Sequence, residues 1–180
     1  MGTGNPDKFM EARAVLSEFG LDLRMLKVER VEIQADDLEA IAAFSVRQIE
    51  AGSKPIVVED AGLFIDHFKG FPGPYSSYVL DTIGLQGVLK LIEGEEHRKA
   101  SFKSAVAYRR GDEIKCFNGT VDGTISQDIR GTHGFGYDPI FIPSEGDGRT
   151  LGEMTAEEKN ALSHRARAFR KLGEWLISTG

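Results

Sequence analysis

The sequence is short of cysteine and of long apolar runs. Cys116 is the only cysteine, so no disulfide can form within the chain and no zinc site can be built from several thiolates. The apolar runs are far shorter than a membrane span requires, and the first residues lack the basic-then-apolar pattern of a secretory signal. We therefore expect a cytoplasmic protein in a reducing compartment, without a membrane partner.

Positive charge is also in deficit. The chain has 22 Lys and Arg against 28 Asp and Glu, which gives a formal net charge of −6. A surface that binds nucleic acid is normally basic, so we expect no nucleic-acid partner. A protein that acts on a small anionic molecule needs positive charge only locally. Residues 159–167 supply such a place, with Lys159, Ser163, His164, Arg165 and Arg167.

The length of 180 residues predicts one domain over residues 1–180, or one domain with two lobes. A chain of this size buries about 70% of its unfolded surface, so it needs no covalent staples. Apolar periodicity and capping residues predict helices at 6–19, 36–51, 76–84, 85–94 and from 155 onward. Short β-branched runs predict strands at 23–28, 55–60, 99–125 and 137–143, with turns at Gly111-Asp112 and Asp122-Gly123. The mixture predicts an α/β domain around a mixed sheet.

The stretch "TGNPDK", residues 3–8, reads as a loop that enters a helix. Asn5 can cap the helix and Pro6 suits its first position. Backbone N–H groups at a helix N-terminus bind phosphate well, and Lys8 adds a cation one turn later. The pattern is not a Walker loop, and taken alone it is more typical of a capped helix with a solvated lysine.

Acidic residues stand where a hydrophobic strand ends, in "PIVVEDAGLF", residues 55–64. Ligand-binding residues of open α/β sheets usually lie at this position, at the end of a strand. Adjacent side chains on a strand point to opposite faces, so Glu59 and Asp60 should not share one role. Glu32 lies in a polar connection and is a second candidate carboxylate. Mg²⁺ favours oxygen ligands and commonly uses one or two carboxylates together with substrate phosphates.

The stretch "HGFGYDPIF", residues 133–141, combines glycines with aromatic side chains. An aromatic ring beside accessible backbone can stack on a flat base and offer hydrogen bonds to its edge. The alternative is a glycine-containing turn before a buried strand.

The basic stretch near the C-terminus allows two geometries. One is a single helix from Thr155, with Thr155 and Glu158 as a capping box. The other is a break at Ser163, which places His164 at the start of a second helix. The break brings the basic side chains together better, and we favour it. A solvated basic face is the alternative to a site.

Taken in order, "TGNPDK", "VEDAGL", "FPGPYSSYV", "GFGYDPIF" and "MTAEEKNALSHRARA" resemble the inosine triphosphate pyrophosphatase family. The resemblance covers nearly the whole chain. It implies a homodimer with an elongated mixed β-sheet, flanking helices and two lobes around a central cleft. It also implies Mg²⁺-dependent hydrolysis of purine nucleoside triphosphates with an aberrant base (ITP, dITP, XTP) to the monophosphate and pyrophosphate.

The resemblance also implies roles for residues. The triphosphate loop would be Thr3, Gly4, Asn5, Pro6, Asp7 and Lys8. Glu32 and Asp60 would bind Mg²⁺, and Asp60 would also accept the proton of the attacking water. The base and sugar would be held by Phe135, Gly136, Tyr137 and Asp138. Near the 6-oxo group, base recognition would be completed by Lys159, His164 and Arg165.

The sequence departs from the family pattern at two places. The family's loop follows a hydrophobic strand, whereas only Met1 and Gly2 precede Thr3 here, so either the strand is missing or the natural product starts earlier. Ala61 stands where many relatives have serine, so only a backbone contact with substrate can remain there. Two other functions fit the same residues: a nucleotide sensor without turnover, and a Maf-type pyrophosphatase that acts on modified pyrimidine nucleotides.

Overall fold

Capping residues set the starts of the main helices. The computed structural model describes residues 1–28, 33–50, 52 and 54–179. Helix α1 (Pro6–Ser17) begins after Asn5, and α2 (Leu38–Gln48) begins after Asp37, each capped by that side chain. Helix α4 (Ala156–Leu162) begins with the expected capping box of Thr155 and Glu158. These starts confirm the expected ones, because a cap satisfies N–H groups that the helix itself leaves unpaired.

The strands form one five-stranded sheet in the order β2-β1-β3-β4-β5. They are β1 (Ile56–Ile65), β2 (Pro72–Gly73), β3 (Lys99–Arg110), β4 (Glu113–Ile125) and β5 (Phe141–Pro143). Strand β1 pairs with β2, and β4 with β5, in antiparallel register, while Gly2 forms a parallel bridge with Leu26. With the helices α3 (Ser76–Leu91) and α5 (His164–Thr179), this confirms the predicted mixed α/β class.

Glycine positions explain where the expected strands and helices were right and wrong. Strands β3 and β4 are joined at Gly111, whose φ of 60° suits the predicted turn. The second turn, expected at Asp122-Gly123, is wrong because β4 runs through it. A Cβ at Gly123 would lie 2.3 Å from the Ile142 carbonyl oxygen, so this glycine permits close approach of β5. Helix α3 is interrupted at Gly84, close to the expected boundary between two helices.

The expected strand at residues 23–28 is not a strand in the structure; it contributes only the bridge at Leu26. Met1 and Gly2 nevertheless take part in strand-like pairing. The Gly2 N–H donates to the Val57 carbonyl at 2.8 Å, and the Leu26 N–H donates to the Met1 carbonyl at 2.8 Å. The residues before the predicted phosphate loop are therefore tied to β1.

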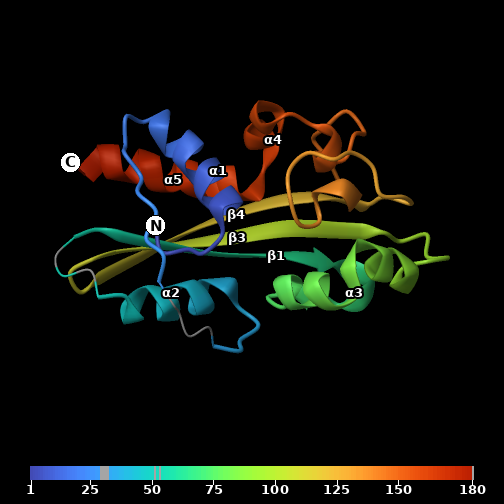
Figure 1. Cartoon of the computed structure of the whole chain (residues 1–180), viewed down its shortest axis with the longest axis horizontal. Helices are drawn as coiled ribbons and strands as arrows, with labels where there is room; N and C mark the ends of the chain where they lie inside the picture. Colours follow the sequence, from blue (N-terminus) through green and yellow to red (C-terminus); the bar gives the residue numbers. More distant parts are fainter. Residues whose placement is uncertain (29–32, 51, 53, 180) are drawn as a thin grey trace. The chain divides into compact units, whose positions relative to one another are not determined.

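The chain divides into two compact units. Unit 1 comprises Met1–Asp60, Ser104–Gly119 and His164–Gly180, and unit 2 comprises Ala61–Lys103 and Thr120–Ser163. In unit 1, α1 packs along α5, and Figure 1 shows α2 on the other side of the strands. Each unit has its own core. The unit 1 core includes Val15, Val57, Val106, Phe169 and Leu172, and the unit 2 core includes Leu63, Ile92, Ile125, Phe141 and Leu151.

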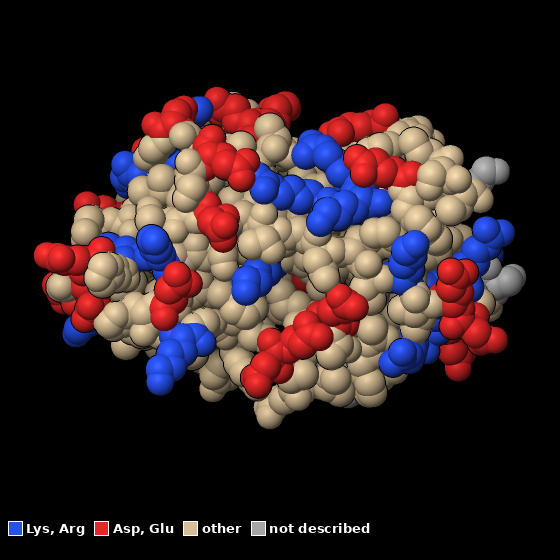
Figure 2. Space-filling view, turned by 180° about the vertical axis from the view of Figure 1, so that it is seen from behind, with Lys and Arg blue, Asp and Glu red and all other residues tan. Residues whose placement is uncertain are grey.

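The charged side chains are mixed on the face drawn in Figure 2. Lys and Arg lie among Asp and Glu there, so this face is not a continuous basic surface. In the part of the chain that the structure describes, no helix combines the length and apolarity needed to cross a membrane.

Candidate functional site

The predicted phosphate loop is held by its own side chains. The Asn5 Oδ1 accepts hydrogen bonds from the N–H groups of Asp7 and Lys8, at 2.9 and 3.0 Å. The Thr3 Oγ1 accepts from the Asn5 N–H at 3.1 Å, and Thr3 itself is buried. These hydrogen bonds fix the conformation of the loop. Because two first-turn amides already donate to Asn5, an incoming phosphate would meet mainly the positive end of α1 and the Lys8 ammonium.

Gly4 and Gly136, one in each predicted loop, have free space where a side chain would begin. No atom lies within 4 Å of the place where a Cβ would stand at either residue. Gly136 has a φ of 66°, a conformation that glycine adopts without strain. Backbone at these two positions is therefore not covered by neighbouring side chains.

Glu59 and Asp60 differ sharply in environment, as expected for neighbours on a strand. Glu59 is 2% exposed, whereas Asp60 is half-buried. Both lie within β1, where Ala61 follows them and is also half-buried. The strand does not end at the acidic pair, as the sequence suggested, but continues to Ile65.

Glu59 is the centre of a buried ionic network in unit 1. Its Oε1 accepts from the Ser104 Oγ at 2.9 Å and from the Arg165 Nε at 3.0 Å. Its Oε2 forms an ion pair with the Lys8 Nζ at 3.0 Å. Arg165 also donates from Nη1 to the Glu11 Oε2 at 2.6 Å. One buried carboxylate thus joins α1, β3 and the start of α5.

The charge of this carboxylate is stabilised by its neighbours. Burial alone raises the pKa of Glu59, but the positive charges of Arg165, Lys8 and His164 outweigh that effect and lower the pKa to about 2. Glu59 is therefore ionised at neutral pH, and cations of the protein already compensate its charge. It is a poor candidate for a metal ligand.

Helices α4 and α5 are separated at Ser163, as we favoured. Ser163 has extended backbone angles, φ −68° and ψ 149°, between α4 and α5. His164 and Arg165 form the first turn of α5 and are both buried. A Cβ at Gly119 would lie 2.0 Å from the His164 carbonyl oxygen, so β4 backbone touches this turn directly.

Unit 2 holds the other predicted residues in a second cluster. The Asp138 carboxylate accepts from the Phe135 N–H at 2.7 Å and forms an ion pair with the Lys159 ammonium. The Lys159 Nζ lies over the Phe135 ring, 4.5 Å from its centroid, and Lys159 is 3% exposed. The Tyr137 hydroxyl donates to the Ser76 carbonyl at 2.6 Å, and burial raises the pKa of Tyr137. Tyr137 is thereby fixed as a support of this loop.

The structure separates the partners of the three predicted base-recognition residues. Lys159 contacts Asp138 and Phe135 within unit 2. Arg165 contacts Glu59 and Glu11 within unit 1, and His164 lies beside it at the start of α5. Arg165 is thus committed to a structural network that its position in the sequence did not suggest.

The expected Mg²⁺ ligands are Glu32 and Asp60. Glu32, one of the two expected ligands, lies outside the described residues. Among the residues that the structure does describe, no group of three His, Cys, Asp or Glu side chains could hold a metal. Such a group is not required, since Mg²⁺ often takes one or two carboxylates and completes its shell with water and phosphate. Asp60, half-buried and on the opposite face from the cation-compensated Glu59, suits that chemistry.

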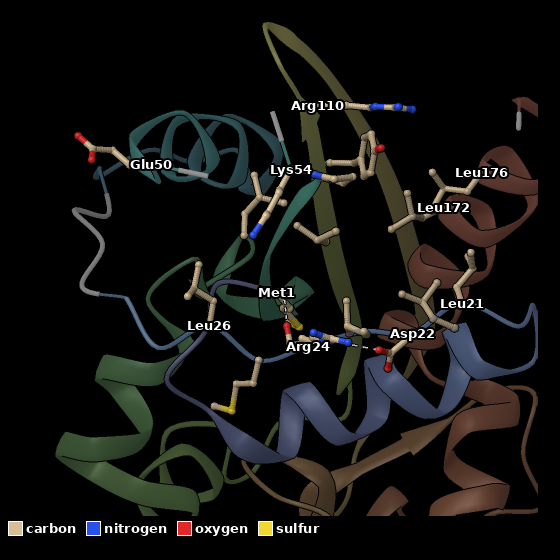
Figure 3. A pocket seen from close by; sticks show the side chains of 17 residues that line it. Met1, Leu21, Asp22, Arg24, Leu26, Glu50, Lys54, Arg110, Leu172 and Leu176 are labelled. Carbon is tan, nitrogen blue, oxygen red and sulfur yellow. Dashed lines mark hydrogen bonds and ion pairs between the residues drawn. The ribbon is translucent and has the colours of Figure 1, made fainter. Parts of the chain in front are cut away.

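A cavity of about 990 Å³ lies elsewhere in unit 1. Figure 3 shows its lining, which includes Met1, Leu21, Leu26 and Leu172. The Met1 ammonium at its edge donates to the Arg24 carbonyl at 2.6 Å. None of the predicted site residues lines this cavity, so its volume is no guide to the chemistry.

Three contributors to the ionic network were not expected from the sequence: Glu59 itself, Glu11 and Ser104. Glu11 follows Lys8 by three residues, a spacing that places both on one helix face and is a usable signal. Ser104 lies 45 residues from Glu59, and Arg165 lies 106 residues from it. No local pattern connects residues so far apart.

Comparison with known proteins gives consistent matches over the whole chain. The sequence profile of the Ham1 family matches residues 1–175. The dITP/XTP pyrophosphatase of Thermococcus kodakarensis is 51% identical over 175 residues, which cover 97% of this chain and 94% of that protein. The dITP/XTP pyrophosphatase of Saccharolobus solfataricus is 48% identical over 98% of this chain and 92% of its own. Among solved structures, a HAM1 protein from Coxiella burnetii matches with a TM-score of 0.85 and 28% identity, over 98% and 96% of the two chains.

Proposed function

Because the chain belongs to the Ham1 family, we propose that it hydrolyses purine nucleoside triphosphates with an aberrant base, such as ITP, dITP and XTP. The products are the nucleoside monophosphate and pyrophosphate. The observation that carries this proposal is the 51% identity, over 97% of the chain, with a relative named dITP/XTP pyrophosphatase. The chemistry of the described side chains supports it at both ends of the substrate.

The phosphate end of the substrate is assigned to unit 1. The loop from Thr3 to Lys8 opens α1, whose N-terminus attracts anions. Lys8 is the cation nearest to the start of that helix, and its side chain is 22% exposed, so it can reach a ligand. A triphosphate needs such compensating charge because its own charges repel one another.

Asp60 is assigned as the general base. Water is a weak nucleophile, so a carboxylate must orient it and accept its proton during attack on phosphorus. Asp60 is the half-buried carboxylate of β1, whereas Glu59 next to it is enclosed by cations. A carboxylate with a polar, accessible side can hold a water and release the proton again.

A divalent cation, Mg²⁺, is part of the proposal. Asp60 would hold it together with Glu32, and the ion would offset negative charge on the phosphates. Asp60 then has two tasks, which is compatible with its two carboxylate oxygens.

The base end of the substrate is assigned to the cluster of unit 2. The backbone around Gly136 and the Phe135 ring would hold the base and sugar, next to Asp138 and Tyr137. Lys159 is a buried donor held beside that ring. Hypoxanthine and xanthine carry an acceptor at position 6, whereas adenine carries a donor amine. Lys159 would leave that amine unpaired, and a buried mismatch of donors supports large discrimination.

His164 and Arg165 are assigned to the same recognition through the first turn of α5. Both are buried, and Arg165 is held by two carboxylates. Covalently, His164 follows directly on Ser163, the last residue of unit 2.

The proposal extends to assembly and location. We assign the whole chain, residues 1–180, to one pyrophosphatase domain that acts as a homodimer in the cytoplasm. A set of exposed apolar side chains in unit 2 supports a protein interface. It consists of Phe71, Tyr75, Tyr78, Ile83 and Leu91, each more than 40% exposed.

The test is pyrophosphate release from a panel of ITP, dITP, XTP, GTP, ATP, dUTP and modified pyrimidine triphosphates, with and without Mg²⁺. The proposal predicts metal-dependent release from the first three and little from ATP. Tight binding of ITP without release would instead identify a sensor. Preference for modified pyrimidines would identify a Maf-type activity.

A further inference from the structure

Glu59 is a buried charge that the proposed reaction does not use. Its side chain is fully enclosed, so it cannot touch a substrate. A buried carboxylate is costly unless it is paired and hydrogen-bonded, and here every contact comes from the protein. Such a group has to act through its partners.

The two oxygens of this carboxylate have different tasks. Oε1 is fixed by two donors, Ser104 Oγ from β3 and Arg165 Nε from α5. These contacts prevent rotation of the carboxylate. Oε2 is thereby aimed at the Lys8 ammonium, 3.0 Å away. The buried contacts of Glu59 with Ser104 and Arg165 therefore determine where the Lys8 ammonium is held.

Lys8 is the outermost member of the network. Its side chain is 22% exposed, against 0% for Glu59, 3% for Arg165 and 14% for Glu11. The ion pairs join two carboxylates to two cations, Lys8 and Arg165, so these four side chains are neutral by formal charge. The ammonium therefore stands at the surface of a compensated cluster, in the first turn of α1, beside the phosphate loop.

A lysine without an anchor would sample many rotamers, and ordering it on binding costs free energy. The ion pair with Glu59 removes much of that cost in advance, since the ammonium already occupies one position.

We propose that Glu59 is a positioning residue that holds the Lys8 ammonium ready for the polyphosphate of the substrate. This inference rests on the proposed function. Glu59 acts through Lys8, and Arg165 and Ser104 act through Glu59. The consequence is a dependence that a purely structural ion pair would not produce: removing Glu59 weakens phosphate binding only while Lys8 is present.

The experiment is a double-mutant cycle with Glu59→Gln, Lys8→Met and both changes together. Inorganic tripolyphosphate, in the presence of Mg²⁺, is the probe, and calorimetry gives its Kd. Each single variant should raise Kd about tenfold, the size expected for a lost contact to a charged group. The double variant should bind as Lys8→Met alone does, because the second change has nothing left to act through. Effects that multiply, or an unchanged Kd in Glu59→Gln, would overturn the inference.

Glu11→Gln is the matched control. It removes the other carboxylate of the network, which forms an ion pair with Arg165. Tripolyphosphate Kd should stay within about twofold, while the melting temperature falls, since a charged pair is broken in both variants. An equal loss of affinity in Glu11→Gln would show that the network acts as a general support.

Kinetics with ITP give a second readout. Glu59→Gln should raise KM more than it lowers kcat, because a ground-state contact to phosphate is lost. Should Glu59→Gln fail to fold, Glu59→Asp keeps the charge and shortens the side chain by one methylene. It should raise the tripolyphosphate Kd by a smaller factor that again vanishes when Lys8 is Met, and an unchanged Kd would overturn the inference.

The wild-type protein separates this inference from the proposed function. If it binds tripolyphosphate with the predicted cycle but releases no pyrophosphate from ITP, the proposed function fails and the positioning role stands. If it hydrolyses ITP and the cycle is multiplicative, only the positioning role fails. A wild-type protein that does not bind tripolyphosphate at all would overturn the positioning role, while pyrophosphate release from ITP alone decides the proposed function.

Discussion

The Lys159 ammonium lies over the Phe135 ring, 4.5 Å from its centroid, and the Asp138 carboxylate pairs with this ammonium and accepts a hydrogen bond from the Phe135 backbone N–H. The contact is one of cation and aromatic face, which is stronger when the cation is desolvated, as it is here. Asp138 thus links Lys159 to the backbone of the loop that carries the ring. A base that stacks at this loop would therefore meet a fixed ring and a fixed donor.

Lys159→Met should relax base selectivity. The change keeps the apolar length of the side chain and removes the donor, so the ratio of kcat/KM for ITP to that for ATP should fall about tenfold or more. Lys103→Met is a matched control, since the exposed Lys103 also lies 4.5 Å from a phenylalanine ring, that of Phe64. A control that loses as much selectivity would contradict the assignment of Lys159.

Asp60→Asn should abolish most turnover while nucleotide binding persists. The amide cannot accept the proton of the attacking water, and loss of a general base costs about 10²- to 10⁴-fold in kcat. Single-turnover assays and calorimetry with ITP separate the two effects. Asp66→Asn, at an exposed position of the short helix after β1, should leave kcat unchanged. Near-normal rates in Asp60→Asn would remove Asp60 as the base.

Acid stability should report the Glu59 network. Since the pKa of Glu59 is lowered to about 2 in the fold, its charge stabilises the protein above about pH 4.5. That contribution, about 3 kcal/mol, is lost as the pH falls toward 2. Urea unfolding at a series of pH values should show this loss in the wild type and a smaller pH dependence in Glu59→Gln. Equal slopes in the two proteins would contradict the low pKa.

The Cys116 thiol should react slowly with alkylating reagents. Burial, and after it the negative charge of Glu39, raises the pKa of Cys116 to about 11. Only the thiolate reacts, so alkylation at neutral pH should be about 100-fold slower than for a free cysteine. Mass spectrometry after timed iodoacetamide treatment gives the rate. Labelling as fast as in the urea-unfolded chain would contradict this environment.

Local chemistry predicted the helix starts well, because a cap is satisfied within three residues of chain. Asn5, Asp37 and Thr155 all cap the helices expected of them, and the break at Ser163 lies where the sequence favoured it. The turn expected at Asp122-Gly123 was wrong because the sequence does not distinguish a glycine that allows close approach of a neighbouring strand from a glycine that makes a turn. Only the position of Phe141 and Ile142 distinguishes them.

The sequence names candidate site residues, but it reveals few of the contacts that these residues make. The loop at Thr3–Lys8 and the pairing of Asp138 with Lys159 involve motifs that the sequence makes visible. No motif reveals the two hydrogen bonds that Glu59 accepts from Ser104 and Arg165. These residues are distant in the sequence and meet Glu59 only when the sheet and α5 have formed. Arg165, expected near the base, has two carboxylates of its own unit as partners.

The most direct measurement is a competition assay with equimolar ITP and ATP and excess Mg²⁺, with all products identified by chromatography. The proposed function predicts that IMP and pyrophosphate appear in equal amounts while ATP remains. Release of orthophosphate with IDP, or consumption of ITP and ATP at equal rates, would contradict it.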